Sequence, residues 1–148
     1  MDHLRQTTRG LVLLGALSLT TTVLADDQDV IDYRKHVMKT LGEQLGAVHM
    51  MLDKKAPADA FVTDMKVIAL AAGQAKSAFE PKVAGGNSKP EVWSNWADFA
   101  KRLDTLTAAS ASLAKAAQDG GPVAVGPKLD AALDCKGCHD LYMVPAKK

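Results

Sequence analysis

The chain has 148 residues, enough for one domain and too few for two of ordinary size, and its formal net charge is only +1. It is rich in Ala, Leu, Lys and Asp and poor in aromatic and β-branched runs, which favours helices and argues against a fold built on sheets.

The first 25 residues have the pattern of a signal peptide. Two arginines precede an apolar run, 11–19, that is too short to span a bilayer, and a polar stretch then leads to small or apolar residues ending at Ala25. A membrane anchor or a buried helix is the alternative, but acidic residues follow Ala25 at once. We therefore predict a cleaved signal peptide over 1–25 and a mature domain over 26–148.

Cleavage at this point would leave the protein close to neutral. The number of Lys and Arg residues falls from 18 to 16 and that of Asp and Glu from 17 to 16. A net charge near zero lacks the excess of positive charge typical of nucleic-acid-binding proteins, so we expect no nucleic-acid partner. No other long apolar run follows, so we expect no membrane attachment after cleavage.

Three segments, 31–52, 61–79 and 92–117, repeat their apolar residues three and four positions apart. This spacing predicts amphipathic helices, each with one apolar seam that packs against its neighbours at a shallow angle. The seam residues are Ile31, Arg34, Met38, Leu41, Leu45, Val48 and Leu52 in the first segment, Phe61, Met65, Ile68, Ala72, Ala75 and Phe79 in the second, and Val92, Trp96, Phe99, Leu103, Leu106, Ser110, Leu113 and Ala117 in the third.

A shorter fourth helix is predicted to begin near Pro122 or Pro127 and to run to about Tyr142. Glycines and a proline at 120–122 end the third helix, and a loop of about ten residues that includes Gly85 joins the second helix to the third. Four helices with mostly short loops and one long connection predict an all-α protein, an antiparallel four-helix bundle.

One seam position carries a charge. Arg34 places a guanidinium on the core side of the first helix, where an unpaired charge would be costly. A small pocket between the first and fourth helices would be equally unfavourable unless something filled it. We therefore expect an anionic, largely apolar guest at this place.

The stretch Cys-Lys-Gly-Cys-His near the end of the chain contains both cysteines. On a helix Cys135, Cys138 and His139 stand at positions i, i+3 and i+4, so their side chains share one face. This pentapeptide is the signature of c-type haem attachment, in which the two thiols form thioethers with the vinyl groups and the imidazole binds the iron. We predict one covalent haem c, with Cys135 and Cys138 as attachment sites and His139 as the axial ligand.

Three alternative roles for the cysteine pair fit the sequence less well. A simple disulfide, which export would permit, gives His139 no role. A thiol–disulfide oxidoreductase of the thioredoxin type needs a βαβ setting, and the sequence has no strand pattern. Zinc needs four ligands, and only His36 and His49 could join, neither of them on the seam. No acid–base pair accompanies the motif, so we do not expect an enzyme.

In addition to the haem motif near the C-terminus, the sequence contains "IDYRKHVMKTLG" in the first helix and "GGNSKPEVW" before the third. These three stretches resemble the class II c-type cytochromes, with the cytochrome c′ family as the nearest group. The resemblance covers the whole mature chain. It implies a periplasmic four-helix bundle that can form a homodimer through its first two helices, and it places Arg34 near the haem propionates. The family usually carries a basic residue where this chain has Met143, which we expect one helical turn beyond His139 and on the same face of the porphyrin.

The resemblance assigns the opposite face of the haem to the first helix, where Met38 lies one turn after Arg34. Met38 either fills space against the haem or binds the iron as a sixth ligand, and the family permits both. A sixth ligand predicts single-electron transfer between redox partner proteins. The alternative is a five-coordinate iron that binds NO or CO, and thiol–disulfide exchange is a remote third function.

Overall fold

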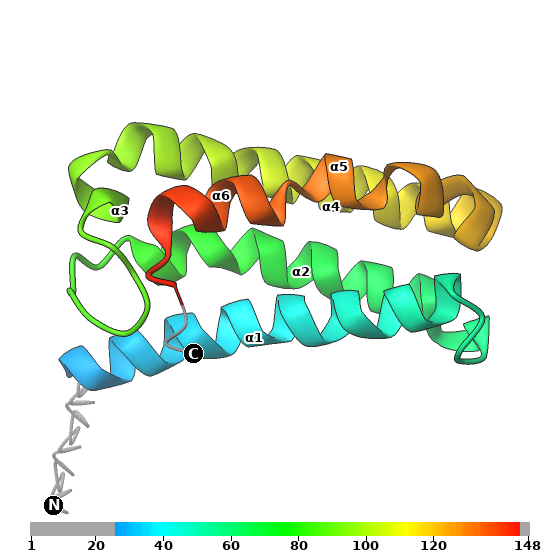
Figure 1. The fold of residues 1–148 in the computed structure, drawn as a ribbon, viewed down its shortest axis with the longest axis horizontal. Helices are drawn as coiled ribbons and strands as arrows, with labels where there is room; N and C mark the ends of the chain where they lie inside the picture. Colours follow the sequence, from blue (N-terminus) through cyan, green and yellow to red (C-terminus); the bar gives the residue numbers. More distant parts are fainter. Residues whose placement is uncertain (1–25, 146–148) are drawn as a thin grey trace, which may run out of the picture.

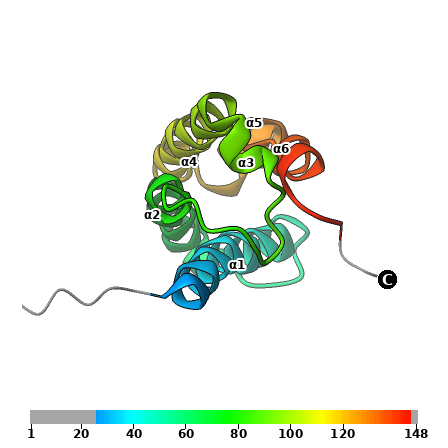
Figure 2. The ribbon, with the colours of Figure 1, turned by 90° about the vertical axis from the view of Figure 1, so that its left-hand side faces the viewer.

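The computed structural model describes residues 26–145, which form four antiparallel columns of helix (Figure 1). The end view separates the four columns clearly (Figure 2). Within this range no helix is both long and apolar enough to cross a membrane. The elements are α1 (Asp27–Leu52), η1 (Ala58–Ala60), α2 (Phe61–Phe79), α3 (Glu91–Ser94), α4 (Trp96–Val125), η2 (Gly126–Lys128), α5 (Leu129–Leu133) and α6 (Cys135–Tyr142). The predicted all-α four-helix bundle is confirmed.

Helix α1 begins directly after the predicted signal peptide, which lies outside the described residues. Asp26 caps the helix, because its Oδ1 accepts the backbone N–H of Asp29 at 2.8 Å. In return the backbone N–H of Asp26 donates to Oδ2 of Asp29 at 3.4 Å, which completes a capping box. The acidic side chains of the first turn also interact favourably with the helix dipole.

Two apolar clusters hold the four columns together. The first contains Met65, Ile68 and Leu113, and the second is aromatic and lies around Phe99. The ring of Phe99 meets that of Phe79 at 5.1 Å between centroids and that of Tyr142 at 5.0 Å, both edge to face. Aromatic pairs prefer this geometry. The second cluster therefore joins α2, α4 and α6.

The predicted seams are confirmed completely in α2 and only in part in α1. All six seam residues of α2 are buried. In α1, Arg34 and Val48 are buried as predicted, but Val37 and Met51 are buried as well. The other predicted seam residues are half-buried, because much of this face of α1 borders a cavity instead of packing directly on another helix; Ile31, Met38, Leu41 and Leu45 line that cavity.

The prediction of a single fourth helix is wrong. The helix is interrupted at Asp134, whose φ of 43° and ψ of 40° lie in the left-handed region. Helix α5 therefore ends there and α6 begins. Asp is among the few non-glycine residues that tolerate this conformation. Its side chain then caps α6 by accepting the N–H of Gly137 at 3.3 Å. The break therefore gives the helix with the cysteine motif its own direction.

The third segment is also divided. Asn95, with φ −119° and ψ 45°, separates the short α3 from α4. Near the predicted end of the segment, Gly121 has φ 63° and ψ −157°, a conformation that only glycine adopts readily, and the chain bends there. Helical turns resume at Pro122 and continue to Val125, a few residues beyond the predicted end.

The loop 80–90 crosses one end of the bundle and pairs with the C-terminal segment. The backbone N–H of Val144 donates to the carbonyl of Asn87 at 2.8 Å, and that of Lys89 donates to the carbonyl of Tyr142 at 2.9 Å. Gly85 has a φ of 126°, and a Cβ built there would lie 2.8 Å from Cδ1 of Ile31. The loop therefore lies directly on the first turns of α1.

Candidate functional site

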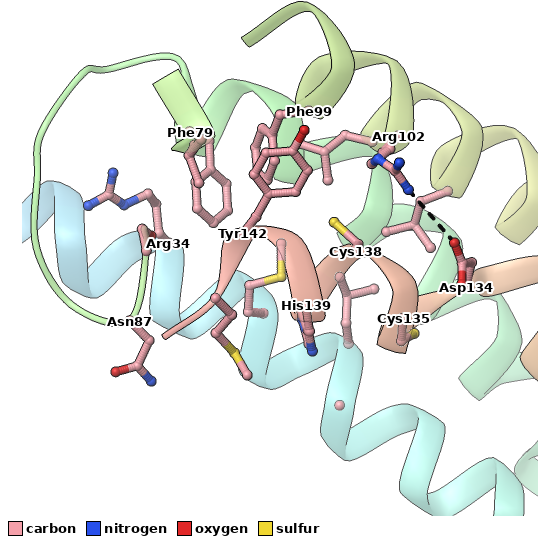
Figure 3. Close-up of a pocket in the computed structure, with 18 of the residues that line it drawn as sticks. Arg34, Phe79, Asn87, Phe99, Arg102, Asp134, Cys135, Cys138, His139 and Tyr142 are labelled. Carbon is pink, nitrogen blue, oxygen red and sulfur yellow. Dashed lines mark ion pairs between the residues drawn. The ribbon is translucent and has the colours of Figure 1, made fainter. Parts of the chain in front are cut away.

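A cavity of about 800 Å³ lies between α1, the loop 80–90 and the wall formed by α4, α5 and α6 (Figure 3). This volume is in the range of pockets that hold cofactors and other small molecules. Its lining is mainly apolar, with a few charged groups at defined places. The apolar residues of the wall include Ile31, Leu41, Leu45, Phe79, Phe99 and Leu103.

Helix α6 contributes Cys135, Cys138 and His139 to the cavity wall. The two thiols are unbonded, with Cys138 the less exposed of them. Partial burial raises the pKa of both thiols above the ordinary value. Reactive thiols of redox enzymes have a lowered pKa instead, so this environment does not favour thiol–disulfide exchange.

Arg34 projects from α1 at the end of the cavity near the loop that carries Asn87 (Figure 3). Only 2% of its surface is exposed, and Nε, Nη1 and Nη2 have no hydrogen-bond partner. Its guanidinium carbon lies 5.4 Å from the ring centroid of Phe79 and 5.0 Å from that of Trp93. Burial lowers the pKa of Arg34.

These aromatic rings compensate the charge of Arg34 only in part. Cation–π attraction acts on the positive charge but provides no acceptors in the plane of the N–H groups, and unsatisfied buried donors are costly. A guest with carboxylates would supply the missing acceptors. Haem carries two propionates on a large apolar ring, so the buried guanidinium, the apolar cavity and the paired thiols fit a haem c.

Met38 and His139 line the cavity from different helices, α1 and α6. Gly42, one turn after Met38, also lines it, and a Cβ built on this glycine would meet no atom within 4 Å. The sequence alone does not single out Gly42, although its position eight residues after Arg34 places it on the same helix face. The α1 wall is therefore open at Gly42, whereas Met38 packs against the second apolar cluster.

Met143 lies at the end of α6 and also lines the cavity. Its backbone N–H donates to the carbonyl of His139 at 3.0 Å, but its φ of −113° and ψ of 135° are extended. A bridge to Ser88 holds it in that conformation. The expectation that Met143 continues the helix of His139 is therefore wrong, because the helix ends at Tyr142.

A polar network that sequence reasoning missed forms the α4 side of the cavity. The hydroxyl of Tyr142 donates to Oδ2 of Asp98 at 2.5 Å, and Nε of Arg102 donates to the same oxygen at 2.7 Å. Nδ2 of Asn95 donates to the Tyr142 hydroxyl at 3.2 Å, and Nη1 of Arg102 lies 3.9 Å from Oδ2 of Asp134. The only local signal in the sequence is the i, i+4 spacing of Asp98 and Arg102.

The network changes the proton affinities of Asp98 and Tyr142 in opposite directions. The hydrogen bonds from Tyr142 and Arg102 lower the pKa of the Asp98 carboxyl, because they favour its charged form. Burial and the hydrogen bond to Asp98 raise the pKa of the Tyr142 hydroxyl. Both shifts favour a charged Asp98 that accepts from a neutral Tyr142.

The histidines considered as zinc ligands do not join the cysteine motif. His36 is exposed, and Nε2 of His49 lies 2.9 Å from Oδ1 of Asp130, in a contact between α1 and α5. Among residues 26–145, no group of three or more His, Cys, Asp or Glu side chains is arranged to hold a metal ion.

Comparison with known proteins agrees with the geometry. The family model of cytochrome c′ matches residues 29–143. Cytochrome c′ of Rubrivivax gelatinosus is 36% identical over 124 residues, which cover 77% of this chain and 93% of that protein. Cytochrome c′ of Alcaligenes xylosoxydans xylosoxydans is 27% identical over 124 residues, or 80% of this chain and 95% of that one.

Solved structures of cytochrome c prime from Alcaligenes xylosoxidans share the fold. A nitric oxide complex of a point mutant superposes with a TM-score of 0.70 at 26% identity, covering 82% of this chain and 99% of that one. A carbon monoxide complex of another variant gives 0.69 at 27% identity, covering 82% and 98%. Proteins of this family bind one covalently attached haem c, which confirms the predicted cofactor. The matched residues, the four-helix bundle and the cavity beside the Cys-x-x-Cys-His motif together show that the chain belongs to the cytochrome c′ family.

Proposed function

We propose that this protein is a periplasmic carrier of single electrons, in which Cys135 and Cys138 would hold haem c and His139 and Met38 would bind its iron. The observation that carries the proposal is the placement of Met38 and His139 on different walls of one cavity. Bound haem would supply one-electron iron chemistry, and a methionine ligand opposite histidine is typical of cytochromes that transfer electrons.

The remaining residues of the cavity have supporting roles in this proposal. Arg34 would donate to a propionate and so acquire the acceptors that its buried nitrogens lack. The apolar residues of α1, α2 and α4 would exclude water and keep the local dielectric low, which shifts the reduction potential of the iron. Gly42 would leave room for the cofactor beside Met38.

Gas binding is the second candidate function, and a specific observation supports it. Point variants of cytochrome c prime from Alcaligenes xylosoxidans form complexes with nitric oxide and carbon monoxide. Met38 is only half-buried, and the wall around it is open at Gly42. If the thioether packs against the wall without binding the iron, the distal side would be free for a small neutral gas.

The predicted signal peptide supports the periplasmic location. The basic and apolar pattern of 1–25 lies outside the described residues, and the described domain starts with the capped helix at Asp26. Exported proteins in bacteria reach an oxidising compartment, where the thiols of a Cys-x-x-Cys-His motif would be oxidised unless they are used. Covalent attachment of haem is the use that this motif predicts.

An absorption spectrum and a mass spectrum of the full-length product, expressed in a bacterium that matures c-type cytochromes, test the proposal. We expect denatured protein from the periplasm to have the mass of residues 26–148 plus one haem. We expect the native protein to be low-spin in both oxidation states and unchanged by carbon monoxide. A high-spin spectrum that shifts with carbon monoxide would contradict electron transfer and support gas binding. A mass without haem would contradict both functions.

A further inference from the structure

One pair of residues on α4 contacts side chains at both ends of α6. Asp98 accepts from the hydroxyl of Tyr142, the last residue of α6, and Arg102 faces Asp134, which caps its first turn. Asp98 and Arg102 are joined to each other at 2.7 Å. Figure 3 shows Arg102, Asp134 and Tyr142 on the same side of the cavity as Cys138. The haem motif therefore lies between the two points of contact.

Apart from the haem attachment proposed above, helix α6 has little besides such contacts to orient it. It has eight residues, and a helix of this length is not stable alone. Of its side chains only Tyr142 is buried, and the left-handed turn at Asp134 separates it from α5. Apolar packing therefore anchors α6 only at its C-terminal end, through Tyr142.

Apart from the hydrogen bond that Asn95 donates to the Tyr142 hydroxyl, the other polar contacts of α6 do not set its rotation about its axis. Lys136 pairs with Asp140, but both belong to α6 itself. Lys89 donates through Nζ to the carbonyl of Asp140 at 2.9 Å and through its backbone to that of Tyr142, which holds the position of the C-terminal end. Backbone contacts near one end leave the helix able to rotate. Two side-chain contacts at opposite ends restrict that rotation.

We propose that Asp98 and Arg102 are positioning residues that clamp α6 in the rotation at which its cysteines and histidine face the cavity. The inference rests on the proposed function in one respect, because its effect on the iron requires His139 to be the axial ligand. The tyrosine hydroxyl is the essential contact of the clamp, since it lies one helical turn after His139. Loss of the clamp lets α6 rotate and weakens the alignment of His139.

Tyr142→Phe is the decisive variant, because it removes the hydroxyl and keeps both the charge and the ring that packs on Phe99. In the haem-loaded protein we expect amides of α6 to exchange with deuterium about three- to tenfold faster, while those of α2 do not change. We also expect a changed reduction potential or spin equilibrium, which loss of charge could not explain.

Asp98→Ala removes the acceptor of the Tyr142 hydroxyl and of Nε of Arg102, and Asp119→Ala is its matched control. Asp119 accepts from Lys115 at 2.8 Å, also at i, i+4 spacing on α4, but neither residue lines the cavity. Both changes replace an acid by alanine in α4, but Asp98 lies in the first turn, where its charge also favours the helix dipole, so the comparison is made on exchange in α6. We expect faster exchange in α6 for Asp98→Ala alone. Combining it with Tyr142→Phe should add little, because both remove the same contact.

Each result can be assigned to one of the two proposals. Equal exchange in α6 for wild type, Tyr142→Phe and Asp98→Ala would overturn the clamp and leave the proposed function intact. Faster exchange throughout the protein, α2 included, would show a general loss of stability and would also overturn the clamp. Wild-type protein without covalent haem would contradict the proposed function, whereas the exchange comparison would still decide whether the clamp exists.

Discussion

The guanidinium carbon of Arg34 lies 5.0 Å from the centroid of the Trp93 ring, yet none of the guanidinium nitrogens has a hydrogen-bond acceptor. A buried cation with aromatic neighbours and unsatisfied donors is only partly compensated. Because the same side chain lines the cavity, we interpret the arrangement as a site whose acceptors come with the cofactor. On this interpretation, we expect bound haem to remove the free-energy cost of the unsatisfied guanidinium donors.

Substitution of Arg34 should change the reduction potential. We expect Arg34→Met to lower it by on the order of tens of millivolts, because a nearby buried positive charge favours the reduced iron. Lys101→Met is the control, since Lys101 also lines the cavity but is exposed, and water and salt screen its charge. Potentiometric titration measures both variants. Equal shifts would show that Arg34 acts only as one surface charge among several.

Substitution of Met38 should decide between the two candidate functions. If its sulfur binds the iron, Met38→Leu should convert a low-spin spectrum into a high-spin one and allow carbon monoxide to bind. Met51→Leu is the matched control, because Met51 is a buried methionine of the same helix that packs in the core away from the cavity. A Met38→Leu protein with an unchanged spectrum would show that Met38 is packing.

Alanine substitutions at two glycines should change the free energy of unfolding in opposite directions. Gly85→Ala should lower the free energy of unfolding by about 1–3 kcal/mol, because its φ of 126° is unfavourable for alanine and the Cβ would contact Ile31. Gly46→Ala should raise it by about 0.5–1 kcal/mol, since Gly46 lies within α1 with no atom within 4 Å of a built Cβ. Thermal or denaturant unfolding of the haem-loaded variants measures both. A stabilised Gly85→Ala would contradict the described conformation of the loop.

The clamp on α6 should be sensitive to acid. Tyr142 and Arg102 hold the folded-state pKa of Asp98 below its ordinary value of 3.8, so the charged network stabilises the fold above that pH. This contribution is lost as the pH falls through the lowered folded-state pKa. We expect wild type to be more stable than Asp98→Ala at pH 7 and this difference to shrink below about pH 4. Unfolding of both proteins as a function of pH measures it. A difference that grows on acidification would contradict the assigned pKa direction.

Features that depend on neighbours in the chain were predictable from the amino-acid order. Apolar residues three and four apart define a helix face, so every predicted seam residue of α2 is buried. The same spacing rule indicated that Cys135, Cys138 and His139 share a face, and all three line the cavity. Arg34 was predicted on the core side and is buried. Periodicity within one helix suffices for these conclusions, because i, i+3 and i+4 geometry is local.

Features that depend on contacts between distant segments appeared only in the folded arrangement. The hydrogen bond between Tyr142 and Asp98 joins residues 44 positions apart, and no local pattern indicates it. The break at Asp134 was equally hidden, because aspartate is compatible with a helix and with a left-handed turn. Packing of α6 against α4 and the loop selects between these conformations. Local spacing therefore specified the helices and the residues of the haem motif, whereas long-range packing decided the direction of the helix that carries it.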